Sequence, residues 1–439
     1  MGERERILDH LENDYTEPVR DPVWKHIYLS RGLLKVAEQE PFQKLDRIRQ
    51  LGPAYLVYPG ATHTRRNHSL GVFHLARRLI TILARRNQAD PASRDRGPSA
   101  LPVDMTLEGV KAFLCAALLH DIGHFPFAHS LKDLSVEAHE TLAGRQIVSD
   151  LAPVIRSSLR VEPEAVAAII DRRAEYHGPE NVRFFWSILS GALDIDKLDY
   201  LNRDAFFCGV PYGIQDVDFI LEEVFPHPRE GVAISPKGVT ALENILFSKY
   251  LMYKTVYWHK TVRIATAMIK KGIATGLAEG VIRREDLYGL DDEEFFSRFT
   301  SARCASFRLI EDVRRRALYK QVWREGFRED RDVHRRLEDI AARLALETEI
   351  AREASARIGR AVGPDSIVVD VPERLSFELA VPLTEPVPSG DSEGVQAVSL
   401  FGGLGDFPAA LRSVTISARR DEDLLSTLEK MDLARFISS

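Results

Sequence analysis

The stretch ALLHDIGHFPFAHS, from Ala117 to Ser130, sets three histidines and an aspartate in otherwise apolar surroundings. The segment AFLCAALL is apolar all round, and Gly123 and Pro126 follow it, so we expect a central buried helix that ends within this stretch. Burying imidazoles without partners would cost roughly a few kcal/mol each. A divalent cation removes that cost, because neutral imidazole and carboxylate are suitable ligands for it. The stretch therefore predicts a metal site at the end of a core helix.

The composition limits the classes of protein to be considered. The 439 residues are 45% hydrophobic and 28% charged, which is ordinary for a soluble globular chain. A formal net charge of −6 argues against general binding of nucleic acid, so any attraction for phosphate must be local to a pocket. The three cysteines lack CxxC spacing, which argues against disulfides and a thiolate zinc site. The charged N-terminus and the lack of an apolar run of about 18 residues predict a cytoplasmic protein without a membrane span.

Apolar periodicity predicts a mainly α fold. Helices are expected at residues 67–86, 107–120, 139–151, 163–173, 182–190 and 194–207, as one continuous signal over 240–280, and as a densely charged stretch over 308–360. Residues 88–102 are rich in Pro, Ser, Gly and charge, and indicate an exposed loop. We expect a helical body over residues 1–290, followed by a charged helical connector over residues 291–360.

The pattern changes after the connector. DSIVVDV, LSFELAVPL and VQAVSLF carry β-branched and alternating residues that predict strands. PVPSGDSEG between the second and third indicates a loop, and LLSTLEKMDLARFI indicates a closing helix. Residues 361–439 are therefore predicted to form a small α+β C-terminal lobe.

Four side chains are candidate metal ligands. His120 and Asp121 supply only two, whereas a cation with room for water and substrate takes about four ligands from the protein. His68, at the start of the first long helix, and Asp196, in DIDKLDYLNRD, are the best candidates for the others. Each histidine taken alone would more often be a hydrogen-bonded core residue, but the clustering favours a metal site.

The helix around Asp196 carries a second pattern. Asp196, Tyr200 and Asp204 recur at i, i+4 and i+8, so one face can present a metal ligand, a phosphate donor and a sugar-hydroxyl acceptor. The alternative is a solvated charged face, which the interleaved leucines argue against. The same spacing places Lys249 and Tyr257 on one stripe of a later helix, although aromatic stripes more often pack in a core.

Six stretches together resemble the dNTP triphosphohydrolase branch of the HD-domain phosphohydrolases, which includes dGTPase-like enzymes and is related to the vertebrate dNTPases with a sterile-alpha-motif domain. They occur in the order of that family and at nearly its spacing. They are FQKLDRIRQLG from Phe42, YPGATHTRRNHSLGV from Tyr58, LLHDIGHFPFAHS from Leu118, HE at His139, DIDKLDYLNRD from Asp194 and YKTVYWHK from Tyr253. The resemblance implies that the helical body is an HD domain.

The resemblance also implies an activity and roles for residues. Water attacks the α-phosphorus of a deoxynucleoside triphosphate, and deoxynucleoside and intact triphosphate are released, with the help of Fe, Mn, Zn or Co and with Mg²⁺ on the nucleotide. The implied metal ligands are His68, His120, Asp121 and Asp196. The implied catalytic residues are His124, His129, His139 and Asp133. The implied substrate-binding residues are Gln50, Leu51, Arg65, Lys197, Tyr200, Asp204, Lys249 and Tyr257.

The chain departs from the pattern of this family at two positions. Where the family often has an acidic residue three positions after His129, this chain has Lys132, and Asp133 follows one residue later. The general-acid role of His129 then depends on whether Asp133 reaches it. Trp258 stands where a relative that accepts several dNTPs has glutamine, which replaces a hydrogen bond to the base by stacking. Base preference is left open.

The resemblance extends to partners. Relatives in this branch assemble as dimers or tetramers, and some are activated by nucleotides bound between subunits. We therefore expect a homo-oligomer with a dNTP as substrate, allow for an activating nucleotide, and expect neither a membrane nor nucleic acid as partner. The arginine-rich residues 308–336 could serve an anion site, but interleaved acidic residues favour a solvated, salt-bridged helix.

Two other functions stay open at this point. The first is an HD nucleotidase or phosphodiesterase that acts on another nucleotide, which the candidate triphosphate-binding cations Arg65, Lys197 and Lys249 argue against. The second is a nucleotide-responsive regulatory or single-strand nucleic-acid-binding protein with a vestigial metal site. The net charge and the complete set of ligands argue against it.

Overall fold

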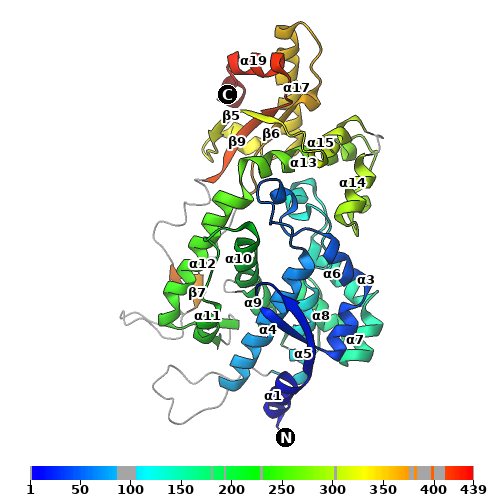
Figure 1. The fold of residues 1–439 in the computed structure, drawn as a ribbon, viewed down its shortest axis with the longest axis vertical. Coiled ribbons are helices and arrows are strands. Elements are labelled where there is room, and N and C mark those ends of the chain that lie inside the picture. The colour runs from blue at the N-terminus through cyan, green and yellow to red at the C-terminus, as the bar shows by residue number, and fades with distance from the viewer. Residues whose placement is uncertain are drawn as a thin grey trace.

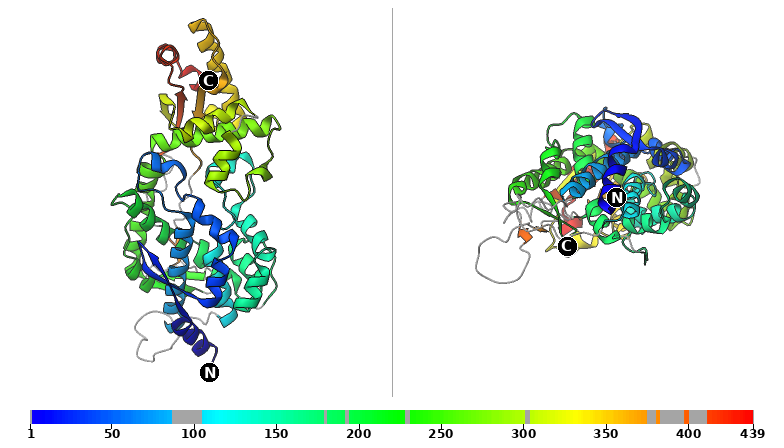
Figure 2. Two further views of the ribbon diagram at one scale, coloured as in Figure 1. Left: turned by 45° about the vertical axis from the view of Figure 1, so that its right-hand side comes forward. Right: turned by 90° about the horizontal axis from the view of Figure 1, so that it is seen from below.

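The computed structural model describes residues 2–86, 105–178, 181–191, 194–227, 231–300, 304–374, 380–382, 397–399 and 411–438. The molecule is elongated, and its two termini lie toward opposite ends of the long axis (Figures 1 and 2). The loops expected at residues 88–102 and 386–394 fall outside the described residues.

Residues 1–290, expected to be helical, begin with a helix and a β-hairpin, and the sequence did not predict the hairpin. The first elements are α1 (Glu3–Asn13), β1 (Tyr15–Asp21), β2 (Lys25–Ser30), α2 (Arg31–Ala37), α3 (Glu40–Gln43), and the 3-10 turns η1 (Lys44–Arg47) and η2 (Gly52–Leu56). Strands β1 and β2 pair antiparallel, and α1 packs on α4 and α5 of the body. Asp21, at the end of β1, is buried and reaches the site described below.

The body is mainly α, as predicted. Its helices are α4 (Arg65–Arg86), α5 (Leu107–Leu119), α6 (His139–Val148), α7 (Ala152–Leu159), α8 (Pro163–Ile170), α9 (Val182–Ser190) and α10 (Ile195–Cys208), with the 3-10 turn η4 (Ala128–Leu134) before α6. Helix α5 packs against α4, α8 and α9, and its apolar residues from Val110 to Leu119 are fully buried. Helices α6 and α8 end earlier than expected, whereas α4, α5, α9 and α10 lie within two residues of the predicted bounds.

The continuous helix expected over residues 240–280 is interrupted. Before this segment lie α11 (Val217–Glu223), β3 (Val224–His227), β4 (Gly231–Ile234) and the 3-10 turn η5 (Pro236–Gly238). The segment itself consists of α12 (Val239–Met252), the π-helical turn η6 (Tyr253–Tyr257) and α13 (Lys260–Ala278). His259 has an extended backbone and its side chain accepts a hydrogen bond from the Thr261 amide, so it ends one helix and caps the next. Single π-turns often mark functional sites, and this one carries Tyr257.

The C-terminal part is an α+β lobe around a three-stranded sheet. It contains η7 (Arg284–Leu287), α14 (Asp292–Thr300), η8 (Ala305–Phe307), α15 (Arg308–Arg314), β5 (Lys320–Gly326), α16 (Asp332–Arg336), α17 (Ile340–Ile358), η9 (Pro364–Ser366), β6 (Ile367–Asp370), β7 (Ala380–Pro382), β8 (Ala397–Ser399), β9 (Ser413–Ala418), α19 (Glu422–Lys430) and α20 (Arg435–Ser438). The antiparallel sheet has the order β5-β9-β6, and β7 pairs with β8 separately. Helix α17 packs on β6 and on α19.

The expectation of an all-helical segment over residues 308–360 is wrong at β5. Lys320–Gly326 pairs with β9 along its length, so tertiary pairing with a strand about ninety residues later overrides the local charge pattern. Strand β9 was not expected from the sequence. The closing helix is also divided, into α19 and α20.

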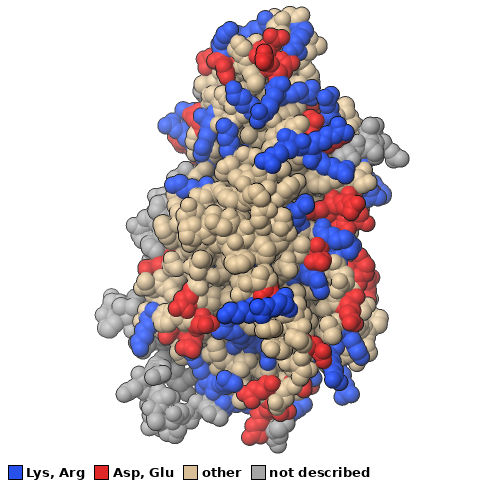
Figure 3. Space-filling model, in the orientation of Figure 1, with Lys and Arg blue, Asp and Glu red and all other residues tan. Residues whose placement is uncertain are grey.

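The lobe rests on the body through α13. Helix α13 contacts β6, α15 and η2, and in Figure 1 it crosses the molecule between the lobe and the body. On the face in Figure 3, Lys and Arg side chains are frequent over the lobe, whereas the middle of the molecule carries few charges. Among the described residues, every helix is too short or too polar to cross a lipid bilayer.

The close approach of α6 to the turn after α5 predicts the effect of substituting Gly123. A Cβ atom there would lie 2.0 Å from the His139 carbonyl oxygen and 2.5 Å from the Ala143 amide, both backbone atoms. Gly123→Ala should therefore lower the free energy of unfolding by about 1–3 kcal/mol, measured in urea. Gly144→Ala is the matched control, since its Cβ would meet only the Ala167 methyl at 3.8 Å. Equal stability of both variants would contradict this packing.

Candidate active site

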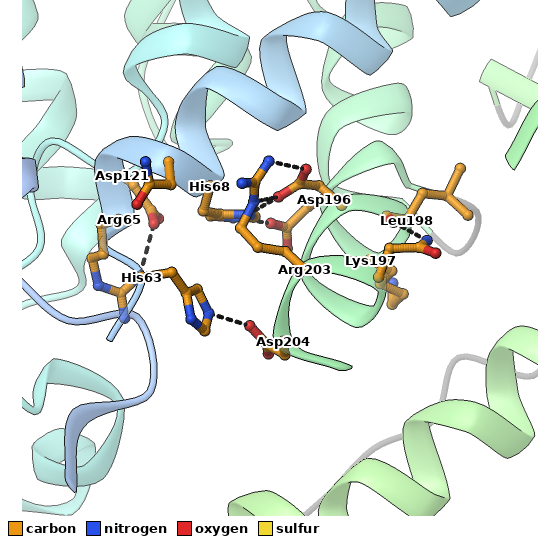
Figure 4. Close-up of polar contacts among 12 residues, drawn as sticks. His63, Arg65, His68, Asp121, Asp196, Lys197, Leu198, Arg203 and Asp204 are labelled. Carbon is orange, nitrogen blue, oxygen red and sulfur yellow. Dashed lines mark hydrogen bonds and ion pairs between the residues drawn. The ribbon is translucent and has the colours of Figure 1, made fainter. Parts of the chain in front are cut away.

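Three side chains from separate helices converge at one point. Nε2 of His68, on α4, lies 2.8 Å from Oδ1 of Asp196, on α10, and 3.3 Å from Nε2 of His120, at the end of α5. The third distance, from His120 to Asp196, is 3.8 Å. The three ligand atoms lie within 4.8 Å of one another, and in Figure 4 His68 and Asp196 point toward each other. This geometry matches that of residues gathered around a cation.

The protonation of the two imidazoles favours a cation between them. Nδ1 of His120 lies 3.0 Å from the Ala117 carbonyl oxygen and Nδ1 of His68 lies 2.8 Å from Oδ2 of Asp199. Both oxygens can only accept, so each Nδ1 carries the proton of its hydrogen bond, and the two Nε2 atoms are left to face each other and Asp196. Burial lowers the pKa of His68, but hydrogen bonds to Asp196 and Asp199 outweigh it and raise the pKa to about 10. A metal cation would replace the proton held there.

A buried ion network behind His68 fixes its orientation. Asp199 accepts a hydrogen bond from His68, two from the Arg203 guanidinium at 2.9 Å each, and one from the Trp24 indole. Arg203 also donates to Asp21 at 2.8 Å. Arg203 and Asp199 are fully buried. A carboxylate behind a ligating histidine sets its tautomer and raises its basicity.

Asp199 and Arg203 were not recognised from the sequence. Asp199 lies three residues after Asp196, and Arg203 four residues after Asp199, so both belong to the helical pattern in DIDKLDYLNRD. The helical spacing that relates Asp196 to Tyr200 and Asp204 therefore also contains the signal for these two residues. The partner Asp21 had no local signal, because it comes from the hairpin.

Asp121 lies between two groups of side chains, the three that converge around His68 and a second group that consists of histidines. Its Oδ1 atom is 3.5 Å from Nε2 of His120 and 3.2 Å from Nε2 of His124, and its Oδ2 atom accepts a hydrogen bond from Arg65 at 2.7 Å. Burial raises the pKa of Asp121, but His124, His120 and Arg65 outweigh burial and hold it well below its usual range. Asp121 is thus an ionised carboxylate next to the candidate metal position.

The rings of His124, His129 and His139 form a second cluster. His124 stacks on His139 with ring centroids 3.8 Å apart, and His129 lies 4.8 Å from His124 and 5.2 Å from His139. His124 is fully buried, whereas His129 is exposed at the cavity wall and His139 is half-buried. Loss of water around the rings is the main cause that lowers the pKa of all three well below 6.5, so the imidazoles are neutral. Neutral imidazoles can accept protons or bind a cation, and their ring nitrogens also lie within 4.8 Å of one another.

A cavity of about 950 Å³ adjoins both clusters. Its walls contain every candidate residue except His124, which is fully buried behind them, namely Gln50, Leu51, Arg65, His68, His120, Asp121, His129, Asp133, His139, Asp196, Lys197, Tyr200, Asp204, Lys249 and Tyr257. Gln50 Oε1 is buried and has no hydrogen-bond partner within the described part of the chain. The cavity is large enough for a nucleotide.

Asp204 is held by two rings. His63 Nε2 lies 2.8 Å from its Oδ1 atom, and the Tyr257 hydroxyl donates to its Oδ2 atom at 2.6 Å (Figure 4 shows the first contact). His63 is buried and stacks on Phe207 with ring centroids 4.6 Å apart. His63 was missing from the predicted site, although it lies within YPGATHTRRNHSLGV.

Residues of the C-terminal lobe form part of the cavity wall. Asp133, on η4, binds Lys270 of α13 at 3.0 Å and Arg343 of α17 at 2.6 Å. Burial raises the pKa of Asp133, but these two cations outweigh it and lower the pKa. The expected contact of Asp133 with His129 is not among the hydrogen bonds of the described residues. Trp258 donates to Glu373 of the lobe at 3.2 Å.

Comparison with known proteins identifies the family. The HD domain model matches residues 65–204, and the HD associated region matches residues 217–382. A Bacillus subtilis protein, YwfO, is 30% identical over 327 residues, which cover 69% of this chain and 70% of YwfO. A Methanocaldococcus jannaschii protein, MJ1154, is 33% identical over 309 residues, 69% of this chain and 59% of that protein. This chain belongs to the HD-domain phosphohydrolases.

More distant relatives include a protein of named activity. The human deoxynucleoside triphosphate triphosphohydrolase SAMHD1 is 26% identical over 308 residues, and the match covers 61% of this chain but only 47% of SAMHD1. An Aquifex aeolicus crystal structure superposes with a TM-score of 0.67 at 25% identity, and covers 94% of this chain and 99% of that one. A phosphohydrolase from Bacteroides thetaiotaomicron has the same fold, with a TM-score of 0.66 at 23% identity over 92% of this chain and 99% of that one.

The buried network predicts that Asp199 controls metal affinity without being a ligand. Asp199→Asn removes the charge behind His68 while keeping its shape, and should weaken Mn²⁺ or Co²⁺ binding by about 10- to 100-fold in a titration. Asp370→Asn is the matched control, because Asp370 is a buried carboxylate that binds Arg263 in the lobe. Wild-type affinity in Asp199→Asn, or an equal loss in Asp370→Asn, would contradict the assignment.

Proposed function

We propose that this protein hydrolyses deoxynucleoside triphosphates to deoxynucleosides and inorganic triphosphate. The observation that carries the proposal is the convergence of His68, His120 and Asp196 at the wall of a nucleotide-sized cavity. The relationship to SAMHD1 supports this choice among HD phosphohydrolases. The cations lining the cavity make a triphosphate a better match than a monophosphate.

The residues present fit a divalent transition metal. His68, His120 and Asp196 would hold it, with Asp121 as fourth ligand, and this mixed nitrogen and oxygen set suits Fe, Mn, Zn or Co. A bound cation would supply a Lewis acid that polarises a phosphoryl oxygen and lowers the pKa of water. Mg²⁺ would accompany the nucleotide phosphates.

The remaining chemistry falls to side chains of the chain. In the net reaction the water oxygen bonds to the α-phosphorus, the bond from that phosphorus to O5′ breaks, and O5′ leaves on the deoxynucleoside with a proton. His129 and His139 line the cavity as neutral imidazoles, and a polyanion beside them raises their affinity for a proton. Either ring can then take up the proton of the water and return one to O5′, while His124 packs behind them.

The residues proposed to bind substrate line the same cavity. Arg65, Lys197, Lys249 and Tyr200 would bind phosphate oxygens, as donors to an anion. Gln50 and Leu51 would meet the base or the sugar. Tyr257 would pack on the deoxyribose next to Asp204, which is held by His63, and a 2′-hydroxyl would be excluded there.

We also propose a homo-oligomer. Four large apolar side chains on or next to α10, α11 and α12 are exposed, namely Phe206, Ile214, Phe219 and Phe247. Exposed apolar groups gathered on neighbouring elements are common at subunit contacts. We also propose that a bound nucleotide activates hydrolysis. The test is whether one dNTP raises the rate at which another is hydrolysed when the two are mixed.

The first test identifies the products. The protein is incubated with Mn²⁺ or Co²⁺ and each of the four dNTPs and four NTPs, singly and mixed, and the products are separated by ion exchange. Deoxynucleoside and triphosphate in equal amounts are expected, and Asp121→Ala should lose turnover and metal together. Release of diphosphate or orthophosphate instead would contradict the proposed reaction.

The second test concerns the sugar. Tyr257→Ala opens space beside Asp204, and should reduce the preference for dNTP over NTP, measured as the ratio of kcat/KM values, by roughly tenfold or more. Tyr257→Phe keeps the ring and should keep most of that preference. An unchanged ratio in Tyr257→Ala would show that the ring does not exclude the 2′-hydroxyl.

A further inference from the structure

The 3-10 turn η4, which carries His129, also carries Lys132. Turn η4 is flanked by Phe127 and Ser135, both in the left-handed backbone region, with φ of 61° and 55°. Asp133 fixes the turn to α13 and α17 through Lys270 and Arg343. The preceding residue, Lys132, is exposed and lines the large cavity. The anchored turn therefore holds the lysine at the cavity wall.

Lys132 lies where two cavities meet. A second cavity of about 490 Å³ adjoins the first, and six residues line both, namely Ala128, Lys132, His139, Glu140, Ile170 and Ser190. Burial is the first cause that lowers the pKa of His129 and His139, and the charge of Lys132 contributes to both shifts. The ammonium group is therefore within electrostatic reach of the rings that would surround the reacting phosphate.

Most other cations of the large cavity already have a carboxylate partner. Arg65 binds Asp121, and Lys197 binds Asp194. Between body and lobe, Arg263 of α13 binds Asp370 and Glu373, and Lys270 of α13 and Arg343 of α17 bind Asp133 of η4, while within the lobe Arg374 and Arg412 bind Glu338.

Lys132 differs from these cations. In the part of the chain that the structure describes, no carboxylate lies within 4 Å of its ammonium group, and its neighbour Asp133 is occupied by two other cations. A flexible ammonium group at a cavity wall can follow a mobile anionic chain, and its pairing with phosphate is charge-assisted.

We propose that Lys132 binds the terminal phosphates of the substrate and of the triphosphate product, at the junction of the two cavities. The inference rests on the proposed function, because it takes the reacting phosphate to lie beside His129 and His139. From the reacting phosphate, the triphosphate group then extends past His139 toward Lys132. The second cavity provides space for its terminal phosphate. Position 132 is a lysine in this protein, where the family often has an acidic residue. The positive charge makes the protein prefer ligands that carry a polyphosphate tail.

The experiment measures binding without turnover. Inorganic tripolyphosphate and orthophosphate are each titrated calorimetrically into the full-length, metal-loaded protein with Mg²⁺ in excess. Lys132→Met should bind tripolyphosphate roughly tenfold or more weakly, with orthophosphate affinity unchanged, and Lys132→Arg should retain most of the affinity. Lys430→Met, an exposed lysine on α19 outside both cavities, is the matched control and should behave as wild type.

Three results would overturn the inference. They are wild-type tripolyphosphate affinity in Lys132→Met, an equal loss of tripolyphosphate and orthophosphate binding, and failure of the wild-type protein to bind tripolyphosphate. Failure of the proposed function gives a different pattern, in which tripolyphosphate binding depends on Lys132 but no dNTP releases triphosphate. If triphosphate is released while Lys132→Met keeps both its tripolyphosphate affinity and its KM for dNTP, the function holds and the inference is wrong.

Discussion

The buried ion pair between Arg203 and Asp199 is the constraint on which the rest of the site depends. It joins α10 to His68 on α4, and through Asp21 it joins both helices to the N-terminal hairpin. The space around it is tight, because a Cβ atom on Gly71 would lie 1.8 Å from Oδ1 of Asp199. Removing one partner of such a pair leaves a buried charge, which is strongly destabilising. The network therefore fixes the orientation of His68 where α4 packs on α10.

A second group of ion pairs connects the turn of His129 to the lobe. One carboxylate, Asp133, anchors the turn of His129 to two elements that are distant in sequence, α13 and α17. Helix α13 also carries Arg263, which binds Asp370 at the end of β6. The lobe thus forms part of the cavity wall, and a movement of the lobe relative to the body would shift the turn that carries His129.

The sequence predicts the local parts of this structure and misses the long-range ones. Helices α4, α5, α9 and α10 have continuous apolar faces, and their bounds follow from periodicity alone. The convergence of His68, His120 and Asp196 agrees with the candidate ligands drawn from the sequence, and their binding of a metal stays a prediction. Strand β5 was missed because its reason to form is pairing with β9. Asp21 and Arg343 were missed for the same reason, since each acts on a residue far away in the chain.

The central claim is that one cation sits between His68, His120, Asp121 and Asp196, and it can be measured directly. Crystals of the Mn²⁺-loaded protein would give an anomalous difference map at the manganese edge. The account predicts a peak about 2 Å from Nε2 of both histidines and from a carboxylate oxygen of each aspartate. A map whose only peak lies among the rings of His124, His129 and His139 would contradict it.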